Sequence, residues 1–283
     1  MNSTNHNTAN DNYRQVPTTF VRTITPGDAK RLLENNTRNR NINERLVSAM
    51  ARDMANGSWV FNGESIKISD TGRLLDGQHR LSACVRADIP FETVVIEGLP
   101  ESAIDTVDAG RKRTAGDVLK MHGYNNNNNL AAAAKTILDY EDHGLRPAIA
   151  NSSAYSNSEI LAFIDKNPEV TDICKRATQF NSVTGGLMTP STAALVYYMF
   201  TRVDRADADR FFDLLQTGAG LDELNPILKL RNYLIAIRTV HAGRRITNFK
   251  VTVLAMKCWN KWRTGQSVVN LRFRENEQIP ELI

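Results

Sequence analysis

The chain lacks the sequence features of secreted, disulfide-bonded and membrane-spanning proteins. Its three cysteines, Cys84, Cys174 and Cys258, lie far apart and match neither a disulfide framework nor a metal-binding spacing. This usage indicates a reducing compartment. The first residues contain no apolar segment typical of a secretory signal, and no apolar run is long enough to cross a bilayer. We therefore expect a cytoplasmic protein without a membrane partner.

The chain also lacks the short motifs that mark several large enzyme classes. It contains no Walker A loop, no GxGxxG fingerprint, no HExxH helix and no GxSxG elbow. What is present is ordinary globular composition, with 41% hydrophobic and 23% charged residues. The formal net charge of +4 and the pI of about 9.0 make the chain mildly basic. That balance permits a polyanionic partner without demanding one.

The length of 283 residues predicts two domains. Residues 1–15 are polar and rich in asparagine, so we expect a disordered tail. Five consecutive asparagines at residues 125–129 cannot pack a core and mark the expected domain boundary. The patterns predict an α+β fold, with strands and helices over residues 16–124 and an all-helical domain over residues 130–283.

The clearest local pattern is GRLLDGQHRLSACVRA at residues 72–87. It predicts a short strand, a sharp turn at Gly77 and a helix, because glycine adopts backbone angles that other residues avoid. A helix that begins there presents unpaired N–H groups and the positive end of its dipole, which suits an anion. His79 and Arg80 lie in its first turn, where cations are unfavourable unless an anion binds. The alternative is that Arg80 pairs with Asp76 or with solvent.

A second polar stretch, from Asp108 to Thr114, reads DAGRKRT. It places three cations beside Gly110 and just before a threonine that can cap a new helix. Such an arrangement suits a phosphate group. The alternative is a solvated basic loop.

The order of the predicted elements is informative. The sequence predicts a helix over residues 43–56, a hairpin over 65–76 and a strand over 91–96. Together with LDGQHRLSA at residues 75–83, this order resembles the nucleotide-binding domain of the ParB/sulfiredoxin superfamily, over roughly residues 16–120. The chain looks most similar to the ParB-like proteins with a DGQHR signature in phages and mobile elements. If the chain is phage-encoded, the expected location is the host cytoplasm.

The resemblance implies a nucleoside triphosphate, carried with Mg²⁺, bound at the turn. Gly77 and the amides after it would cradle a phosphate that Arg80 neutralises, and the second stretch would close over it. Asp76 would hold the Mg²⁺, with Asp108 as the alternative ligand, and Asp76 and His79 are the candidate catalytic side chains. The implied phosphate-binding residues are Gly77, Gln78, His79, Arg80, Asp108, Gly110, Arg111, Arg113 and Thr114.

One position departs from the patterns of the superfamily. Sulfiredoxins carry a reactive cysteine directly after the turn glycine, whereas this chain has Gln78, so sulfiredoxin chemistry is not expected. ParB partition proteins and ParB-like kinases usually carry a glutamate there, linked to nucleotide turnover. Gln78 is uncharged and cannot act as a general base or a carboxylate nucleophile. Hydrolysis would therefore require His79 or an aspartate in place of that glutamate.

Cationic residues recur in the HAGRR turn at 241–245 and in the predicted last helix, from about 248 to 263. They would make a basic face for DNA phosphates. Trp259 and Trp262 are expected in the core, and would stack on bases only if exposed. An acidic cluster over residues 204–213 is expected to be a solvated helix face. The candidate DNA-binding residues are Arg244, Arg245, Lys250, Lys257 and Lys261.

These observations predict a ParB-like protein that binds a nucleotide phosphate at the DGQHR turn and acts with or on DNA. The first alternative is a phosphotransferase or nuclease that uses the same site. The second is a phage-encoded, non-catalytic interaction protein that keeps the fold as a scaffold. The sequence leaves both enzymatic activity and the formation of a homodimer open.

Overall fold

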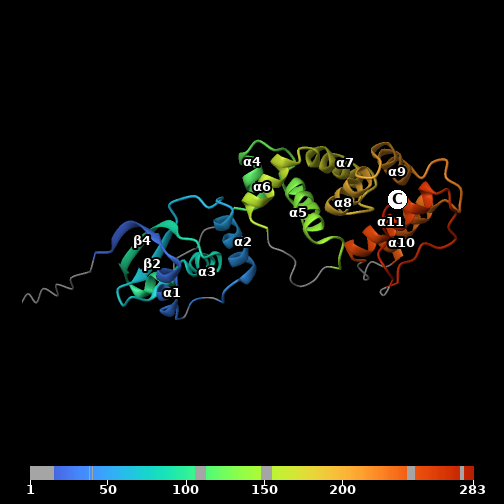
Figure 1. Cartoon of the computed structure of the whole chain (residues 1–283). Coiled ribbons are helices and arrows are strands. Elements are labelled where there is room, and N and C mark those ends of the chain that lie inside the picture. Colours follow the sequence, from blue (N-terminus) through green and yellow to red (C-terminus); the bar gives the residue numbers. More distant parts are fainter. Residues whose placement is uncertain are drawn as a thin grey trace, which may run out of the picture. The chain divides into compact units, whose positions relative to one another are not determined.

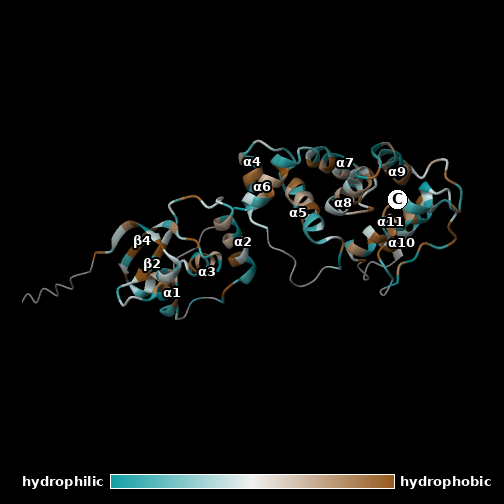
Figure 2. Cartoon of the chain, viewed as in Figure 1, coloured by the Kyte–Doolittle hydropathy of each residue, from teal (hydrophilic) through white to brown (hydrophobic). Residues whose placement is uncertain are grey.

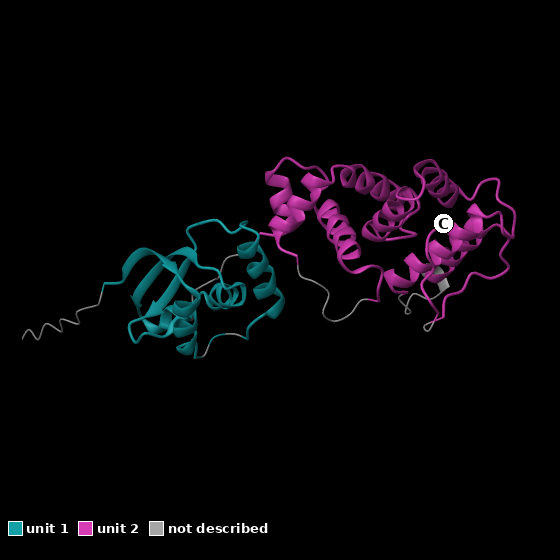
Figure 3. Cartoon of the chain, in the orientation of Figure 1, with its two compact units in different colours: residues 1–111 teal, residues 112–283 magenta. Residues whose placement is uncertain are grey.

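The chain is a mixed α/β protein of the α+β type, and its elements fall into two compact units (Figures 1 and 3). The first comprises residues 1–111 and the second residues 112–283. The structure is a computed structural model. It describes residues 16–37, 39, 41–105, 113–147, 155–240, 246–274 and 277–283, with the backbone alone for residues 105 and 238–240. Within those ranges, no helix is both long and apolar enough to span a membrane.

Four strands form one sheet in the first unit, in the order β1-β4-β2-β3. β1 (Thr18–Ile24) lies antiparallel to β4 (Phe91–Leu99), and β4 lies parallel to β2 (Ser65–Ser69). β2 pairs antiparallel with β3 (Leu74–Asp76), which confirms the predicted hairpin. A short 3-10 helix, η1 (Glu101–Asp105), follows β4. This order puts β3, and the turn after it, at one edge of the sheet.

Three helices share an apolar core with this sheet: α1 (Pro26–Glu34), α2 (Glu44–Ala55) and α3 (Gln78–Ala87). Side-chain caps start the first two, because the Thr25 hydroxyl accepts from an amide of α1 and the Asn43 side chain accepts from two amides of α2. The core therefore combines residues that are far apart in the sequence. Its buried members include Ile24, Val47, Ile66, Leu74, Leu81 and Phe91.

All the regular secondary structure described in the second unit is helical. α8 lies at its centre, because every residue from 192 to 200 is buried and α5, α7, α9 and α11 pack against it. Figure 2 shows hydrophobic and hydrophilic residues interspersed along the surrounding helices. The helices are α4 (Ala115–Met121), α5 (Asn127–His143), α6 (Asn157–Lys166), α7 (Glu169–Val183), α8 (Pro190–Thr201), α9 (Arg205–Thr217), α10 (Pro226–Val240) and α11 (Asn248–Arg263).

The division between the units falls earlier than the boundary expected at residues 125–129. α4 packs against α5 and α6, and the asparagine tract begins α5. The Asn126 side-chain amide donates to the Thr178 hydroxyl at 2.9 Å, and that of Asn127 donates to the Gly116 carbonyl at 2.9 Å. Hydrogen bonds from the side-chain amides thus hold this tract within the second unit, although it has no apolar side chain to bury.

Candidate functional site

The predicted turn lies between β3 and α3, and Gly77 makes it possible. Its φ of 105° is in the left-handed region, where side chains are strained. A Cβ on Gly77 would also lie 2.3 Å from Cδ1 of the buried Ile66, so the end of that side chain would have to shift. No side chain caps α3 from the Gly77 position. The strand therefore meets the helix closely, and the carboxylate of Asp76 lies beside the amide of Gly77, the N-cap of α3.

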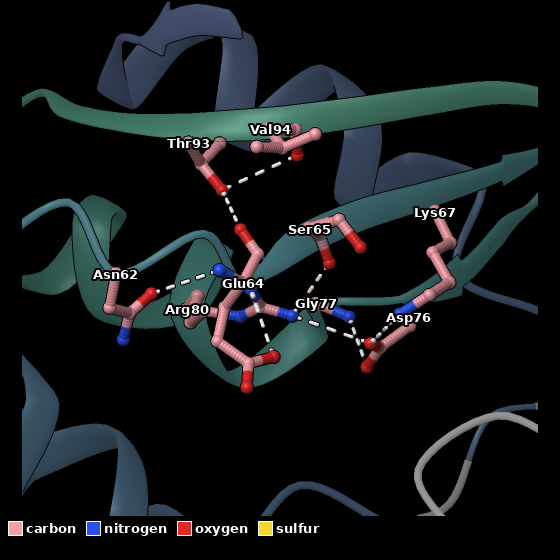
Figure 4. Close-up of polar contacts among 9 residues, drawn as sticks. All are labelled: Asn62, Glu64, Ser65, Lys67, Asp76, Gly77, Arg80, Thr93 and Val94. Atoms are coloured by element: carbon pink, nitrogen blue, oxygen red, sulfur yellow. Dashed lines mark hydrogen bonds and ion pairs between the residues drawn. The ribbon is translucent and has the colours of Figure 1, made fainter. Parts of the chain in front are cut away.

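Three donors converge on the Asp76 carboxylate (Figure 4). Lys67 Nζ lies 3.0 Å and Arg80 Nη2 3.4 Å from Oδ2, and the Gly77 amide donates to Oδ1 at 2.7 Å. Burial raises the pKa of Asp76, but the hydrogen bond from Lys67 and the charges of Arg80 and Lys67 outweigh it and leave the pKa below its usual 3.8. Asp76 is thus an ionised counter-ion for two cations.

Arg80 is buried, with only 8% of its surface exposed. Its Nη2 donates to the Ser65 carbonyl at 2.8 Å as well as to Asp76. Its Nη1 is buried and has no hydrogen-bond partner among the described residues. The nearest acid to Nη1 is Glu64, whose Oε2 lies 4.0 Å away on a side chain that is 66% exposed. The site therefore holds a buried guanidinium whose Nη1 makes a long ion pair with Glu64 but no hydrogen bond among the described residues.

Gln78 and His79 are buried and contact the segment between α1 and α2. The Asn36 amide donates to Gln78 Oε1 at 2.9 Å, and the Asn43 main-chain N–H donates to His79 Nε2 at 3.0 Å. This bond occupies the Nε2 lone pair, so that nitrogen cannot take a proton while the bond persists. Gln78 thus joins the turn to the residues after α1, and His79 joins it to the cap of α2.

Two contributors were missed by sequence reasoning. Lys67 stands directly opposite Asp76 in the β2–β3 register, and that hairpin pairing was the signal that could have found it. Asn39 donates to the Leu74 carbonyl at 2.8 Å, which ties this residue of the connection between α1 and α2 to β3. The only sequence feature that pointed to Asn39 was the high proportion of asparagine in residues 35–43.

The second predicted stretch is described only in part. Arg113 is exposed, and Thr114 begins α4 with a reciprocal capping box, in which its hydroxyl accepts from the Asp117 amide at 3.2 Å. The predicted capping role of Thr114 is therefore confirmed. Both residues belong to the second unit. Asp108, Gly110 and Arg111 lie outside the described residues.

Two of the three predicted DNA-binding residues of α11 have side-chain partners within the second unit. Lys257 pairs with Glu277, and Lys261 Nζ donates to the Gln266 side chain at 3.1 Å. Lys250 is half-buried, and Arg244 and Arg245 lie outside the described residues. Trp259 is fully buried and stacks on a phenylalanine with ring centres 4.1 Å apart, so the expected core role is confirmed.

Two aspartates of the acidic segment in α9 form ion pairs with arginines. Asp207 pairs with Arg263 at 2.9 Å, and Asp209 lies 3.3 Å from Arg205. Within the described ranges, no group of three His, Cys, Asp or Glu side chains is arranged to hold a metal ion. Asp76 thus offers a single carboxylate, which fits a Mg²⁺ ion that arrives with nucleotide phosphates and keeps most of its water ligands.

The turn combines two cations, one carboxylate and a helix amino end, but no available thiolate. The nearest cysteine, Cys84, is buried in α3, and burial followed by the charges of Asp28 and Asp88 raises its pKa to about 11. This chemistry suits an oxyanion ligand. In comparisons with known proteins, no family model, curated protein or solved structure matches the chain.

Proposed function

We propose that the first unit binds the phosphates of a nucleoside triphosphate at the Asp76–Arg80 turn. The observation that carries this proposal is the buried Arg80 Nη1, which has no hydrogen-bond partner among the described residues. A buried charged donor without a partner is costly unless a ligand completes it. The resemblance of the DGQHR turn to ParB-like proteins supports a nucleotide as that ligand.

The charges around the turn favour an anion. Lys67 and Arg80 are two cations that share one close carboxylate, Asp76, and Glu64 keeps its side chain largely in solvent. A phosphate oxygen would accept from Arg80 Nη1 and take over part of the counter-ion role of Asp76. Mg²⁺, when it arrives with the nucleotide, would reduce the phosphate charge, and Asp76 is the residue that would hold it.

The geometry favours binding over turnover. Gln78 carries no charge, and His79 Nε2 already accepts the Asn43 amide. Asp76 is a weak base because its pKa is lowered by its neighbours. We therefore propose nucleotide binding without turnover, and the resemblance to ParB-like proteins is what supports DNA as the partner. The phosphotransferase or nuclease alternative requires Asp76 to act as the base, and the scaffold alternative requires no ligand at the turn.

The test compares two arginines of the same helix. Arg80→Lys keeps the charge but loses the guanidinium donors, whereas Arg86→Lys alters an exposed arginine that pairs with Glu44. Loss of one charge-assisted bond, worth about 1.5–3 kcal/mol, should weaken nucleotide binding roughly ten- to a hundredfold in Arg80→Lys. Titration calorimetry with CTP, ATP, GTP and UTP, with and without Mg²⁺, should show no change in Arg86→Lys.

Two results would redirect this proposal. If the wild-type chain binds none of the nucleotides, the phosphate site is rejected and the scaffold alternative gains weight. If Mg²⁺-dependent phosphate release occurs and Asp76→Ala abolishes it, the enzyme alternative replaces simple binding.

DNA binding needs its own test, in which a steep fall of DNA affinity with rising salt concentration would support contacts to DNA phosphates. No binding at low salt would remove DNA from the proposal.

A further inference from the structure

Two carboxylates lie beside the Arg80 guanidinium, and they are held in different ways (Figure 4). The Asp76 carboxylate also accepts from Lys67 Nζ at 3.0 Å and from the Gly77 amide at 2.7 Å, and only 21% of the Asp76 side chain is exposed. The Glu64 carboxylate approaches Arg80 Nη1 to 4.0 Å, and 66% of the Glu64 side chain is exposed. Asp76 is therefore a fixed part of the turn, whereas one long ion pair joins Glu64 to it.

The main chain of Glu64 is fixed, although its side chain is exposed. The Glu64 amide donates to Asn62 Oδ1 at 3.0 Å, and the hydroxyl of the buried Thr93 donates to the Glu64 carbonyl at 2.8 Å. The next residue, Ser65, begins β2 and accepts from Arg80 Nη2 through its own carbonyl. Rotation about the side-chain bonds of Glu64 therefore moves its carboxylate away from Arg80 without breaking any of these hydrogen bonds. Exposed side chains rotate in picoseconds to nanoseconds.

A bound phosphate and the Glu64 carboxylate would use the same donor. Arg80 Nη1 is buried, so a ligand reaches it only after a neighbouring group moves. A phosphate oxygen bonded to Nη1 at about 2.7–2.9 Å would lie at most about 7 Å from Glu64 Oε2 in its present position. Two anions at that distance repel each other. The phosphate is therefore favoured when the Glu64 carboxylate turns into solvent.

The charges of the turn lead to the same conclusion. Lys67 and Arg80 are balanced by Asp76 and Glu64 while the Glu64 carboxylate lies beside Arg80. When that carboxylate turns into solvent, two cations face one close carboxylate, and the turn has an excess of positive charge. An anionic ligand restores the balance.

We propose that Glu64 is an internal competitor of the phosphate. Its carboxylate pairs with Arg80 Nη1 while the turn is empty and leaves when a phosphate oxygen binds. This inference rests on the proposed phosphate site and adds a residue that regulates its affinity. The observed Kd is the intrinsic Kd divided by the fraction of molecules in which Glu64 has left Arg80. Because an exposed ion pair is weak, that fraction is substantial, and the competition has a several-fold effect.

The first test removes the charge of Glu64 and keeps the shape of its side chain. Glu64→Gln should bind inorganic triphosphate, and the nucleotide that the wild-type chain binds, about three- to tenfold more tightly than the wild-type chain does. Titration calorimetry without Mg²⁺ measures both affinities, so that no ion bridges Asp76 and the ligand. Glu44→Gln is the matched control, because Glu44 is 68% exposed and pairs with Arg86 of the same helix. Its affinities should equal those of the wild-type chain.

A second variant separates competition for Arg80 from general repulsion between anions. Glu64→Asp keeps the charge but is shorter by one methylene group, so its carboxylate no longer reaches Nη1 from the fixed main chain. We expect Glu64→Asp to gain most of the affinity that Glu64→Gln gains. If only Glu64→Gln binds more tightly, general repulsion lowers the affinity and the competition is rejected. Thermal unfolding without ligand checks that each variant folds.

Failure of the competitor differs from failure of the phosphate site. If the wild-type chain binds and Glu64→Gln binds no more tightly, Glu64 is not a competitor, and the proposed phosphate site stands. If neither the wild-type chain nor Glu64→Gln binds triphosphate or any of the four nucleotides, the phosphate site is rejected, and the competitor is rejected with it.

Discussion

Gly77 faces two steric restrictions at the residue scale, and they can be separated. Its backbone is left-handed at φ 105°, and a Cβ there would overlap Ile66 Cδ1 at 2.3 Å. Gly72 has a similar φ of 83° but nothing within 4 Å of a Cβ. The two glycines therefore share the backbone strain, and only Gly77 has the close contact.

Forcing an extra methyl group against the packed Ile66 side chain typically costs about 1–3 kcal/mol, so we expect Gly77→Ala to lower the free energy of unfolding of the first unit by roughly that much more than Gly72→Ala does. In a double variant, Ile66→Val is added to Gly77→Ala and removes the Cδ1 atom that the new methyl group would meet. Urea denaturation of the single and double variants measures the coupling. A double variant no more stable than the sum of its parts would show that the contact with Ile66 is not the cause.

Asp76 is the internal counter-ion of Lys67 and Arg80, which gives a prediction that depends on the proposed function. Asp76→Asn removes a negative charge from the turn, so nucleotide affinity without Mg²⁺ should rise several-fold. With Mg²⁺ the affinity should fall, because the carboxylate that would hold the ion is missing. Nucleotide titrations of the wild-type chain and of Asp76→Asn, each with and without Mg²⁺, measure these changes in affinity. A fall of equal size with and without Mg²⁺ would contradict the counter-ion role.

Residue-scale contacts were the least predictable from the sequence. The glycine turn and its helix followed from local rules. Local pattern could not show that Arg80 donates to the Ser65 carbonyl or that Gln78 accepts from Asn36, which lies 42 positions away. Because Arg80 donates to the Ser65 carbonyl, we expect its removal to lower stability as well as nucleotide binding.

At the element scale, the starts of helices are where sequence and structure agree best. Thr114 caps α4 as predicted, and Thr25 and Asn43 cap α1 and α2 in the same way, because an N-cap needs only one side-chain acceptor close in sequence. The asparagine tract at 125–129 shows the opposite case. Composition alone marked it as a boundary, but its side-chain amides bond to groups on other elements that no local pattern identifies.

The capping box of α1 predicts a dependence on pH. The Thr25 hydroxyl, the Thr25 amide and then Arg31 lower the pKa of Asp28 from 3.8 to about 2. A carboxylate with a lowered pKa stabilises the fold fully above 3.8, and this contribution is lost as the pH falls from there through about 2. We expect the free energy of unfolding to decline over that window. Asp28→Asn should make the decline shallower, and an unchanged slope would contradict the capping role.

At the scale of the whole molecule, the two units have separate apolar cores. Trp59 belongs to the first, where its ring lies 5.9 Å from Phe91, and Trp259 and Trp262 belong to the second. A ligand bound at the Asp76–Arg80 turn stabilises the core that contains it. The indole fluorescence of the two units can therefore report on them separately.

We expect a nucleotide to raise the unfolding midpoint of the first unit and not that of the second. At a free concentration of 100 times Kd the stabilisation is about 2.7 kcal/mol. Thermal unfolding followed by tryptophan fluorescence, with Trp59→Phe as the variant that reports on the second unit alone, measures the two contributions. An equal shift of both midpoints would mean that the ligand does not act through the turn.

The central strand of the sheet also determines when the first unit can form during synthesis. β1 pairs along its whole length with β4, so that Thr18 stands opposite Glu97, and β2 pairs with β4 in parallel. Until β4 has left the ribosome, β1 has no partner and β2 has only the short β3. Nascent chains that stop before Phe91 should therefore remain open to proteases, however well their helices form.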